Sequence, residues 1–162
     1  MSNRMGIALK IGLDIGSTTI KCVVTNHQDQ IVFRAYERHY AQIVEKASIL
    51  LQRIMETFPS HRQAAVALSG SAGMGLAQLG DLPFVQEVYA TRIAALQRLP
   101  GTDVIIELGG EDAKILFLTN GVEVRMNGTC AGGTGAFIDQ MSTLLHLSVE
   151  EMDEAAAEAD KI

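Results

Sequence analysis

Apolar and polar residues alternate in three short runs near the start of the chain, and this two-residue period is typical of β-strands. The runs cover residues 8–16, 20–26 and 30–37, and turn-forming residues separate them at 16–18 and 27–30. Because consecutive strands joined by short connections usually pair side by side, we predict a meander of three strands.

The period then changes to that of a helix. Residues 43–58 place apolar side chains three and four positions apart up to Pro59. This spacing predicts an amphipathic helix of about four turns. Beyond it we expect a strand at 63–70, a short helix at 74–79, a short strand at 83–88 and a helix at 90–99. The resulting order is βββαβαβα.

The three-strand pattern begins again after Pro100 and Gly101. Apolar runs at 102–110, 113–119 and 121–127 precede a helix from Gly135 to about His146, and a last helix follows at 149–161. Ser148 and Glu151 have the spacing of a capping box for that last helix. The pattern therefore predicts an α/β chain built from two related units.

The two units differ in length. We expect one complete lobe at residues 1–100 and the start of a second lobe at residues 101–162. The second lobe lacks the later strands of the first, because the repeat is degenerate or because the chain is cut short. We favour the second explanation.

Composition removes several classes of function. The formal charge is −6 and only 5% of residues are aromatic, so the chain has neither a basic stripe nor a stacking surface for nucleic acid. The apolar runs are of strand length and are broken by charges or glycines, which argues against a membrane span. The first residues lack the apolar core of a signal peptide, so we expect a cytoplasmic protein.

The stretch "LDIGSTTIKC" is the first candidate for chemistry. A strand brings Asp14 to a tight turn, where a carboxylate can hold hydrated Mg²⁺. Backbone N–H groups and hydroxyls of the turn can bind phosphate oxygens. The residues in position to do so are Gly16, Ser17, Thr18 and, on the returning strand, Lys21. The alternative is an ordinary hairpin, since turns of this composition are common.

The stretch "IELGGEDAK" repeats this layout at the start of the second unit. Two such turns are expected to face each other across a cleft and to clamp a Mg²⁺-nucleotide from both sides. Glu107 would bind a water of Mg²⁺ or orient the attacking water. Three charged residues would lie at the lip of the cleft or would simply be surface charges of a hairpin: Glu111, Asp112 and Lys114.

The run "NGTCAGGTGAF" combines four glycines with Cys130 in front of a predicted helix. Glycines in that position suggest phosphate binding, whereas a cysteine suggests redox chemistry or a metal. A helix N-terminus would stabilise a thiolate through its dipole and its free backbone N–H groups. The alternative is a cysteine without a special role. Cys22 lies in the middle of a predicted strand, and we expect it to pack in the core.

These three stretches together resemble the BcrAD/BadFG-type ATPases. This family comprises the activators (component A) of 2-hydroxyacyl-CoA dehydratases and the ATP-binding subunits of benzoyl-CoA reductase. The resemblance implies the actin-like ATPase (ribonuclease H-like) fold, binding of ATP or ADP with Mg²⁺, and ATP hydrolysis. It further implies a homodimer joined through the Cys130 region, with a 4Fe-4S cluster at the interface. One low-potential electron would pass from reduced ferredoxin or flavodoxin to an iron–sulfur acyl-CoA dehydratase or reductase.

The resemblance also assigns residues. Asp14 and Glu107 correspond to catalytic positions, and Cys130 to the first cluster ligand. The nucleotide-binding positions are Gly16, Ser17, Thr18, Thr19, Lys21, Gly109, Gly110, Glu111 and Asp112. Glu107 departs from the small activators, which generally have aspartate there and glutamine in place of Glu111. The sequence "ELGGEDAK" is closer to that of the long activase-type proteins, so we expect the chain to be the N-terminal fragment of one.

A count of thiolates limits what this chain can do alone. A 4Fe-4S cluster takes four cysteine ligands, whereas a symmetric dimer supplies two copies of Cys130. By the resemblance, the second ligand and the adenosine site lie past residue 162. We therefore expect the 162-residue chain to carry no stable cluster and to be inactive.

Two other functions stay open, and the histidines do not help to decide. A small-molecule, sugar-type kinase of the same superfamily would need an acceptor pocket with a base. A non-catalytic nucleotide-sensing module would need only the two lobes.

The four histidines are expected at the surface, because their spacing forms no metal-binding pair: His27, His39, His61 and His146.

Overall fold

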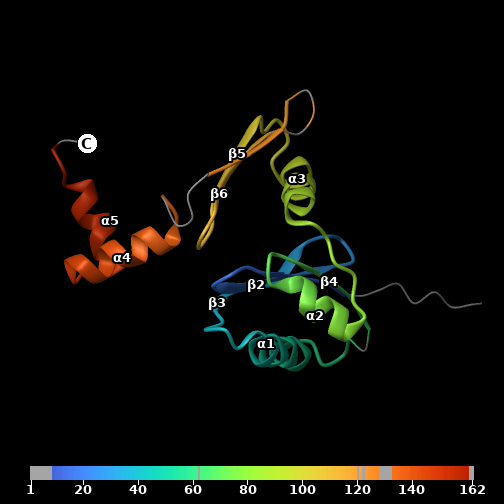
Figure 1. The fold of residues 1–162 in the computed structure, drawn as a ribbon. Helices are drawn as coiled ribbons and strands as arrows, with labels where there is room; N and C mark the ends of the chain where they lie inside the picture. The colour runs from blue at the N-terminus through green and yellow to red at the C-terminus, as the bar shows by residue number, and fades with distance from the viewer. Residues whose placement is uncertain (1–8, 62, 120, 122, 128–132, 161–162) are drawn as a thin grey trace, which may run out of the picture. The chain divides into compact units, whose positions relative to one another are not determined.

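A computed structural model describes residues 9–61, 63–119, 121, 123–127 and 133–160. The chain divides into two compact units, residues 1–99 and 100–162. Figure 1 shows the helices and strands of each unit along the chain. The units are described one at a time below.

The first unit contains a four-stranded sheet in the order β3-β2-β1-β4. Its strands are β1 (Leu9–Ile15), β2 (Thr19–Asn26), β3 (Ile31–Arg38) and β4 (Ala64–Ser69). The first three strands pair antiparallel as consecutive hairpins, which confirms the predicted meander. β4 returns to lie parallel to β1, so the carboxyl ends of these two strands meet at the same edge of the sheet.

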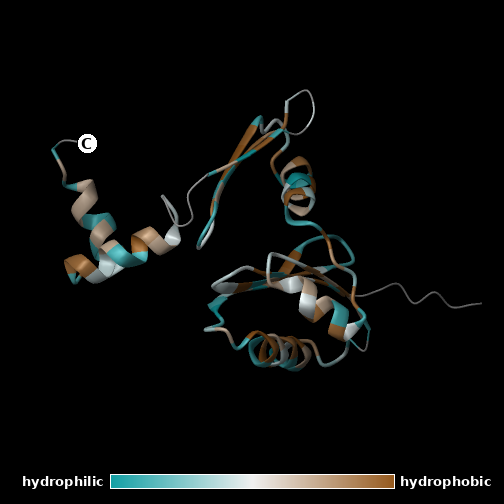
Figure 2. Cartoon of the chain, in the orientation of Figure 1, coloured by the Kyte–Doolittle hydropathy of each residue, from teal (hydrophilic) through white to brown (hydrophobic). Residues whose placement is uncertain are grey.

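One face of this sheet forms the core. Every second residue of β1 is buried, from Leu9 to Ile15, and the same alternation buries Ile20, Cys22 and Val24 on β2. Helix α1 (Ile43–Thr57) supplies Leu50 and two further buried side chains to the same cluster. Figure 2 shows the mixture of apolar and hydrophilic residues along α1 that an amphipathic helix requires. The opposite face of β1 and β2 carries Lys10, Asp14 and Lys21, together with the exposed Val23.

Cys22 is confirmed as a core residue. It is 1% exposed, and burial raises the pKa of its thiol to about 11, partly offset by the positive charge of Arg53. The thiol is therefore neutral at physiological pH and packs as a small apolar side chain.

The predicted strand at 83–88 is wrong in extent. Only Phe84 forms a bridge, beside Leu68 of β4, and helix α3 (Glu87–Arg98) already begins three residues later. The reason is local, because the side chain of Gln86 accepts a hydrogen bond from the Tyr89 N–H and so caps the helix. Helix α2 (Gly73–Gly80) precedes this segment.

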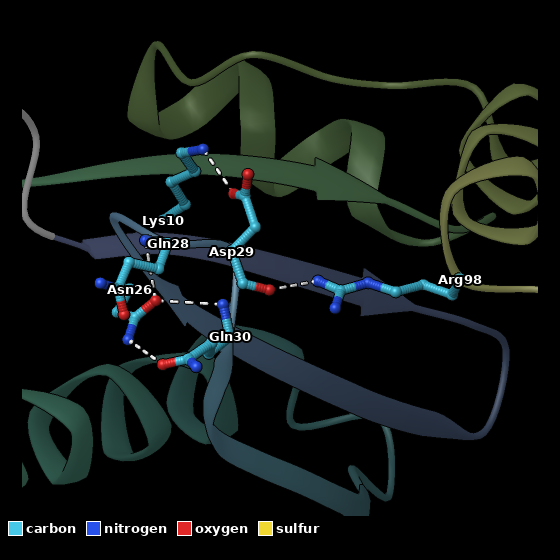
Figure 3. Close-up of polar contacts among 6 residues, drawn as sticks. All are labelled: Lys10, Asn26, Gln28, Asp29, Gln30 and Arg98. Carbon is cyan, nitrogen blue, oxygen red and sulfur yellow. Dashed lines mark hydrogen bonds and ion pairs between the residues drawn. The ribbon is translucent and has the colours of Figure 1, made fainter.

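A cluster of polar contacts ties the end of α3 to the hairpin between β2 and β3 (Figure 3). The Arg98 guanidinium donates to the backbone carbonyl of Asp29, and the carboxylate of Asp29 pairs with Lys10 at 2.7 Å. The side-chain oxygen of Asn26 accepts from two backbone N–H groups of the same turn. Asp29 has a φ of 58°, a left-handed conformation that aspartate and asparagine tolerate well.

The second unit contains a three-stranded antiparallel sheet in the order β5-β6-β7. Its elements are β5 (Val104–Leu108), β6 (Ala113–Phe117), β7 (Glu123–Met126), α4 (Gly135–Leu145) and α5 (Val149–Ala157). The predicted capping box is confirmed, since Ser148 and Glu151 each bond the other's backbone N–H. Within the described residues, neither unit has a helix long and apolar enough to cross a membrane.

Candidate functional site

The hairpin between β1 and β2 holds the first group of candidate residues. Gly16 N–H donates to the Thr19 carbonyl at 2.9 Å and closes the turn. Asp14 lies directly opposite Lys21 in the strand register, on the sheet face away from the core. The Lys21 Nζ to Asp14 Oδ2 distance is 2.8 Å, and both side chains are about a third exposed. This hairpin thus presents a carboxylate, an ammonium group and a tight turn together.

The hairpin between β5 and β6 repeats these contacts at the same spacing. Glu107 lies opposite Lys114, and the Gly109 N–H donates to the Asp112 carbonyl at 2.8 Å. In both hairpins the glycine, the acceptor carbonyl and the lysine follow the acid by two, five and seven residues. The sequence predicted a shared layout of strand, acid and glycines. The structure extends it to the hydrogen bond and to the acid–lysine pair.

The ion pair of the second hairpin is looser and less exposed. The Lys114 Nζ to Glu107 Oε1 distance is 3.8 Å. Lys114 is only 8% exposed, because its side chain lies on the same face of β6 as the fully buried Leu116. The reading of Lys114 as a surface charge is therefore wrong, whereas Glu111 and Asp112 are exposed.

The paired glycines of the second turn also contact helix α4. Gly135 N–H donates to the Gly109 carbonyl at 2.9 Å, and Ala136 N–H donates to the Gly110 carbonyl at 2.8 Å. A Cβ on Gly109 would lie 2.9 Å from the carbonyl oxygen of Asp112, so the turn closes this tightly only around a glycine. The first two amides of α4 are therefore bound by the turn. The sequence analysis expected free N–H groups here that could stabilise a thiolate, but these two amides are already occupied.

The cysteine-bearing run is attached to the second hairpin at both described flanks. On the amino-terminal side, Asn127 N–H donates to the Ala113 carbonyl, and the Asn127 side-chain oxygen accepts from Ala113 N–H, both at 3.0 Å. On the other side, Gly135 binds Gly109 as described. Cys130 itself lies outside the described residues.

The end of β4 contributes a third group that the sequence analysis missed. Ser69 lies opposite Asp14 in the parallel register, and its Oγ is buried without a hydrogen-bond partner among the described residues. Gly70 follows with a φ of +89°, and a Cβ there would lie 2.6 Å from Asp14 Oδ1 and 2.3 Å from the Ile15 carbonyl oxygen. A glycine turn directly after an apolar predicted strand was the available signal, since carboxyl ends of parallel strands commonly form binding sites.

The sequence-based expectation for His39 is wrong. It is 2% exposed and contacts the first turn, which contradicts its expected place at the surface. The exposed positions of His27, His61 and His146 agree with the expectation. Among the residues that the structure describes, no three His, Cys, Asp or Glu side chains form a group that could hold a metal ion.

Several known proteins are similar to this chain in sequence and fold. The (R)-2-hydroxyglutaryl-CoA dehydratase activating ATPase of Acidaminococcus fermentans is 26% identical over 93% of this chain and 59% of its own length. The structure of an activator of 2-hydroxyisocaproyl-CoA dehydratase from Clostridium difficile with bound ADPNP has a TM-score of 0.78 and 26% identity. That match covers 94% of this chain and 58% of the activator. The structure of component A of the Acidaminococcus fermentans (R)-2-hydroxyglutaryl-CoA dehydratase has the same TM-score. That match covers 96% of this chain and 61% of component A.

These similarities confirm the predicted actin-like ATPase fold. The chain spans less than two thirds of the length of these relatives. The profile of the BadF/BadG/BcrA/BcrD ATPase family matches residues 11–162. Because this match leaves out only the first ten residues, the chain belongs to the BadF/BadG/BcrA/BcrD ATPase family.

Proposed function

We propose that this chain belongs to an ATP-hydrolysing, iron–sulfur-dependent activator that delivers a low-potential electron to a 2-hydroxyacyl-CoA dehydratase or a related reductase. The observation that carries the proposal is the pair of matching hairpins, one of which also holds α4 and both flanks of the Cys130 run. Two acidic turns with the same hydrogen bonds suit a ligand that carries several phosphate groups.

The first hairpin would hold phosphate and hydrated Mg²⁺. Asp14 is partly exposed and already faces a cation, Lys21 Nζ, at 2.8 Å, so its carboxylate suits a water of the metal. The Ser69 hydroxyl on the neighbouring strand, which has no hydrogen-bond partner among the described residues, offers a further polar contact. The phosphate ligands would be the backbone N–H groups and hydroxyls of Ser17, Thr18 and Thr19. Gly16 would shape the turn instead, because its N–H already donates to the Thr19 carbonyl. When bound, Mg²⁺ neutralises charge that develops on the phosphate oxygens.

The second hairpin would also bind phosphate. A planar trans peptide points its C=O and its N–H in opposite directions. Because the carbonyls of Gly109 and Gly110 accept from α4, the N–H groups of Gly110 and Glu111 point away from this helix, where phosphate can reach them. Glu107 would orient the attacking water or a water of Mg²⁺, and Asp112 lies exposed at the same turn.

The same hydrogen bonds would transmit nucleotide binding to the redox end. A shift of the Gly109–Gly110 turn must move α4 or break two hydrogen bonds of 2.8–2.9 Å. Cys130, between the two flanks that attach to this hairpin, would be a ligand of a 4Fe-4S cluster shared across a homodimer. Reduced ferredoxin or flavodoxin would donate the electron, and an iron–sulfur acyl-CoA dehydratase or reductase would accept it.

Replacement of Cys130 tests the proposal in the whole gene product that contains this chain. Cys130→Ser is expected to abolish electron delivery while ATP turnover persists, because the thiol is lost and the phosphate turns remain. Cys22→Ala is the control, since this neutral core thiol has no redox role, and it should keep both activities. Unchanged electron delivery by Cys130→Ser would refute Cys130 as a cluster ligand, whereas a wild-type protein that delivers no electron would support a kinase or a nucleotide-sensing module instead.

A further inference from the structure

His39 is a buried histidine beside the first turn. It follows β3 directly and is 2% exposed, and no step of the proposed chemistry uses it. We propose that His39 is a positioning residue, which orients the phosphate-binding N–H groups of the first turn by holding the carbonyls behind them. This inference rests on the proposed nucleotide-binding function.

Two hydrogen bonds join His39 to that turn. The backbone N–H of His39 donates to the Thr18 carbonyl at 3.1 Å. The imidazole Nε2 lies 3.0 Å from the Gly16 carbonyl oxygen. Carbonyls on both sides of Ser17 are therefore held by one residue from outside the hairpin.

A third hydrogen bond fixes the tautomer of the ring. The backbone N–H of Ala41 points at His39 Nδ1 at 3.1 Å, and a backbone N–H can only donate. Nδ1 must therefore accept, which places the proton on Nε2 in the neutral ring. His39 thus donates from Nε2 to the Gly16 carbonyl, and this bond requires that tautomer.

The loop after His39 adopts an unusual backbone to make this possible. Tyr40 and Ala41 have φ values of 49° and 63°, the left-handed region that residues with a Cβ seldom occupy. Gln42 N–H closes the loop onto the His39 carbonyl at 2.8 Å. Two consecutive residues of this kind are costly, so the arrangement indicates a constraint on the position of the imidazole.

The held carbonyls set the direction of the amides that follow them. In a planar trans peptide the N–H points opposite to the C=O. The Gly16 and Thr18 carbonyls point toward His39, so the N–H groups of Ser17 and Thr19 point away from it. The Ser17 N–H has no hydrogen-bond acceptor within the described part of the chain, which leaves it for a ligand.

The second hairpin supports this reading independently. Gly109 occupies the position that corresponds to Gly16, two residues after the acid, and its carbonyl also accepts from outside the hairpin. There the donor is the first amide of α4, Gly135 N–H, at 2.9 Å. The His39 imidazole thus donates to the turn glycine in the first unit, as the N-terminal amide of α4 does in the second.

Two conservative variants separate the contacts of the ring. A glutamine amide reaches about as far as Nε2 and can donate to the Gly16 carbonyl, whereas the asparagine carbonyl replaces Nδ1 and can accept from Ala41. His39→Gln, His39→Asn and His39→Ala would be made in the whole gene product. The exposed His27 gives the matched controls His27→Gln and His27→Asn. Calorimetry measures affinity for Mg²⁺·ADPNP, steady-state assays measure kcat and KM for ATP, and circular dichroism measures Tm.

His39→Gln is expected to bind and turn over nucleotide within about twofold of wild type. His39→Asn and His39→Ala should lose about tenfold or more in kcat/KM, the equivalent of one hydrogen bond. The difference between Gln and Asn should persist at equal Tm. Equal nucleotide affinity and kcat/KM of these two variants, or a loss that follows Tm alone, would overturn the positioning role. Failure of the wild-type protein to bind Mg²⁺·ADPNP would instead refute the proposed function, and this inference with it.

Discussion

Replacement of Gly70 by alanine perturbs the first site at its most crowded point. The added Cβ would lie 2.3 Å from the Ile15 carbonyl oxygen and 2.6 Å from Asp14 Oδ1. The Ile15 carbonyl is held by the Ala72 N–H, which donates to it at 2.9 Å, and Ile15 pairs with Ile20 of β2. Asp14 pairs with both neighbouring strands, and its carboxylate is held by Lys21. The φ of +89° is in addition a conformation that alanine disfavours.

The expected loss of stability is the sum of two costs, the backbone strain and the overpacking. Left-handed backbone costs a residue with a Cβ about 1–2 kcal/mol, and overpacking costs about 1–3 kcal/mol more. We expect Gly70→Ala to lower the free energy of unfolding of the first unit by about 2–5 kcal/mol. Because the strain falls on Asp14, affinity for Mg²⁺·ADPNP should fall as well.

Two other glycines provide matched controls. Gly101 has the same φ of +89°, but a Cβ there would meet nothing within 4 Å, so Gly101→Ala isolates the backbone cost. A Cβ on Gly75 in α2 would also meet nothing within 4 Å, and alanine there should stabilise the helix by up to about 1 kcal/mol. Urea unfolding followed by circular dichroism gives all three values. A Gly70→Ala protein as stable as Gly101→Ala would refute the close packing against Asp14.

Three further changes test other parts of the structure. Leu50→Ala removes a core side chain that is 1% exposed and should cost about 2–5 kcal/mol in urea unfolding, whereas Ile49→Ala, at a half-exposed neighbour, should cost much less. Lys10 lowers the pKa of the exposed Asp29 carboxyl, first by a hydrogen bond and then by its charge, so their pairing stabilises the fold above the ordinary pKa of 3.8. This contribution should fade as the pH falls through the lowered value, and Asp29→Asn, which keeps the left-handed backbone, should remove that part of the pH dependence in thermal melts. Ser148→Ala should weaken α5 by about 1 kcal/mol, seen as faster amide hydrogen exchange there, and unchanged exchange would contradict the capping box.

Periodic burial explains which parts of the fold were predictable. The alternation along β1 and β2 and the helical spacing of α1 bury many apolar side chains at once, so the sequence carries the signal many times over. The segment at 83–88 carried two conflicting signals, since its apolar residues suit a strand and Gln86 suits a helix cap. The side-chain cap of Gln86 decided the outcome, and a single bridge remained at Phe84.

The layout of the two turns could be predicted, because their residues are neighbours in the sequence. The acids and glycines of both turns can be recognised in the sequence, because strand, acid and glycine are adjacent in each. Ser69 and His39 reach the first turn from β4 and from the loop after β3, so no local pattern marks either residue. The sequence left Lys114 open between the lip of a cleft and the surface, because an isolated charge in a strand gives no sign of which face it occupies, whereas its neighbour Leu116 does.

The most direct test of the account is ATP hydrolysis by the whole gene product and by its Asp14→Asn variant. The substitution would keep the size of the side chain and the fold but remove the carboxylate that is proposed to hold the water of Mg²⁺. We predict ATP hydrolysis by the wild-type protein and a fall in kcat of about 10²–10³-fold in the variant, at unchanged Tm. A variant that hydrolyses ATP at the wild-type rate, or a wild-type protein without ATPase activity, would contradict it.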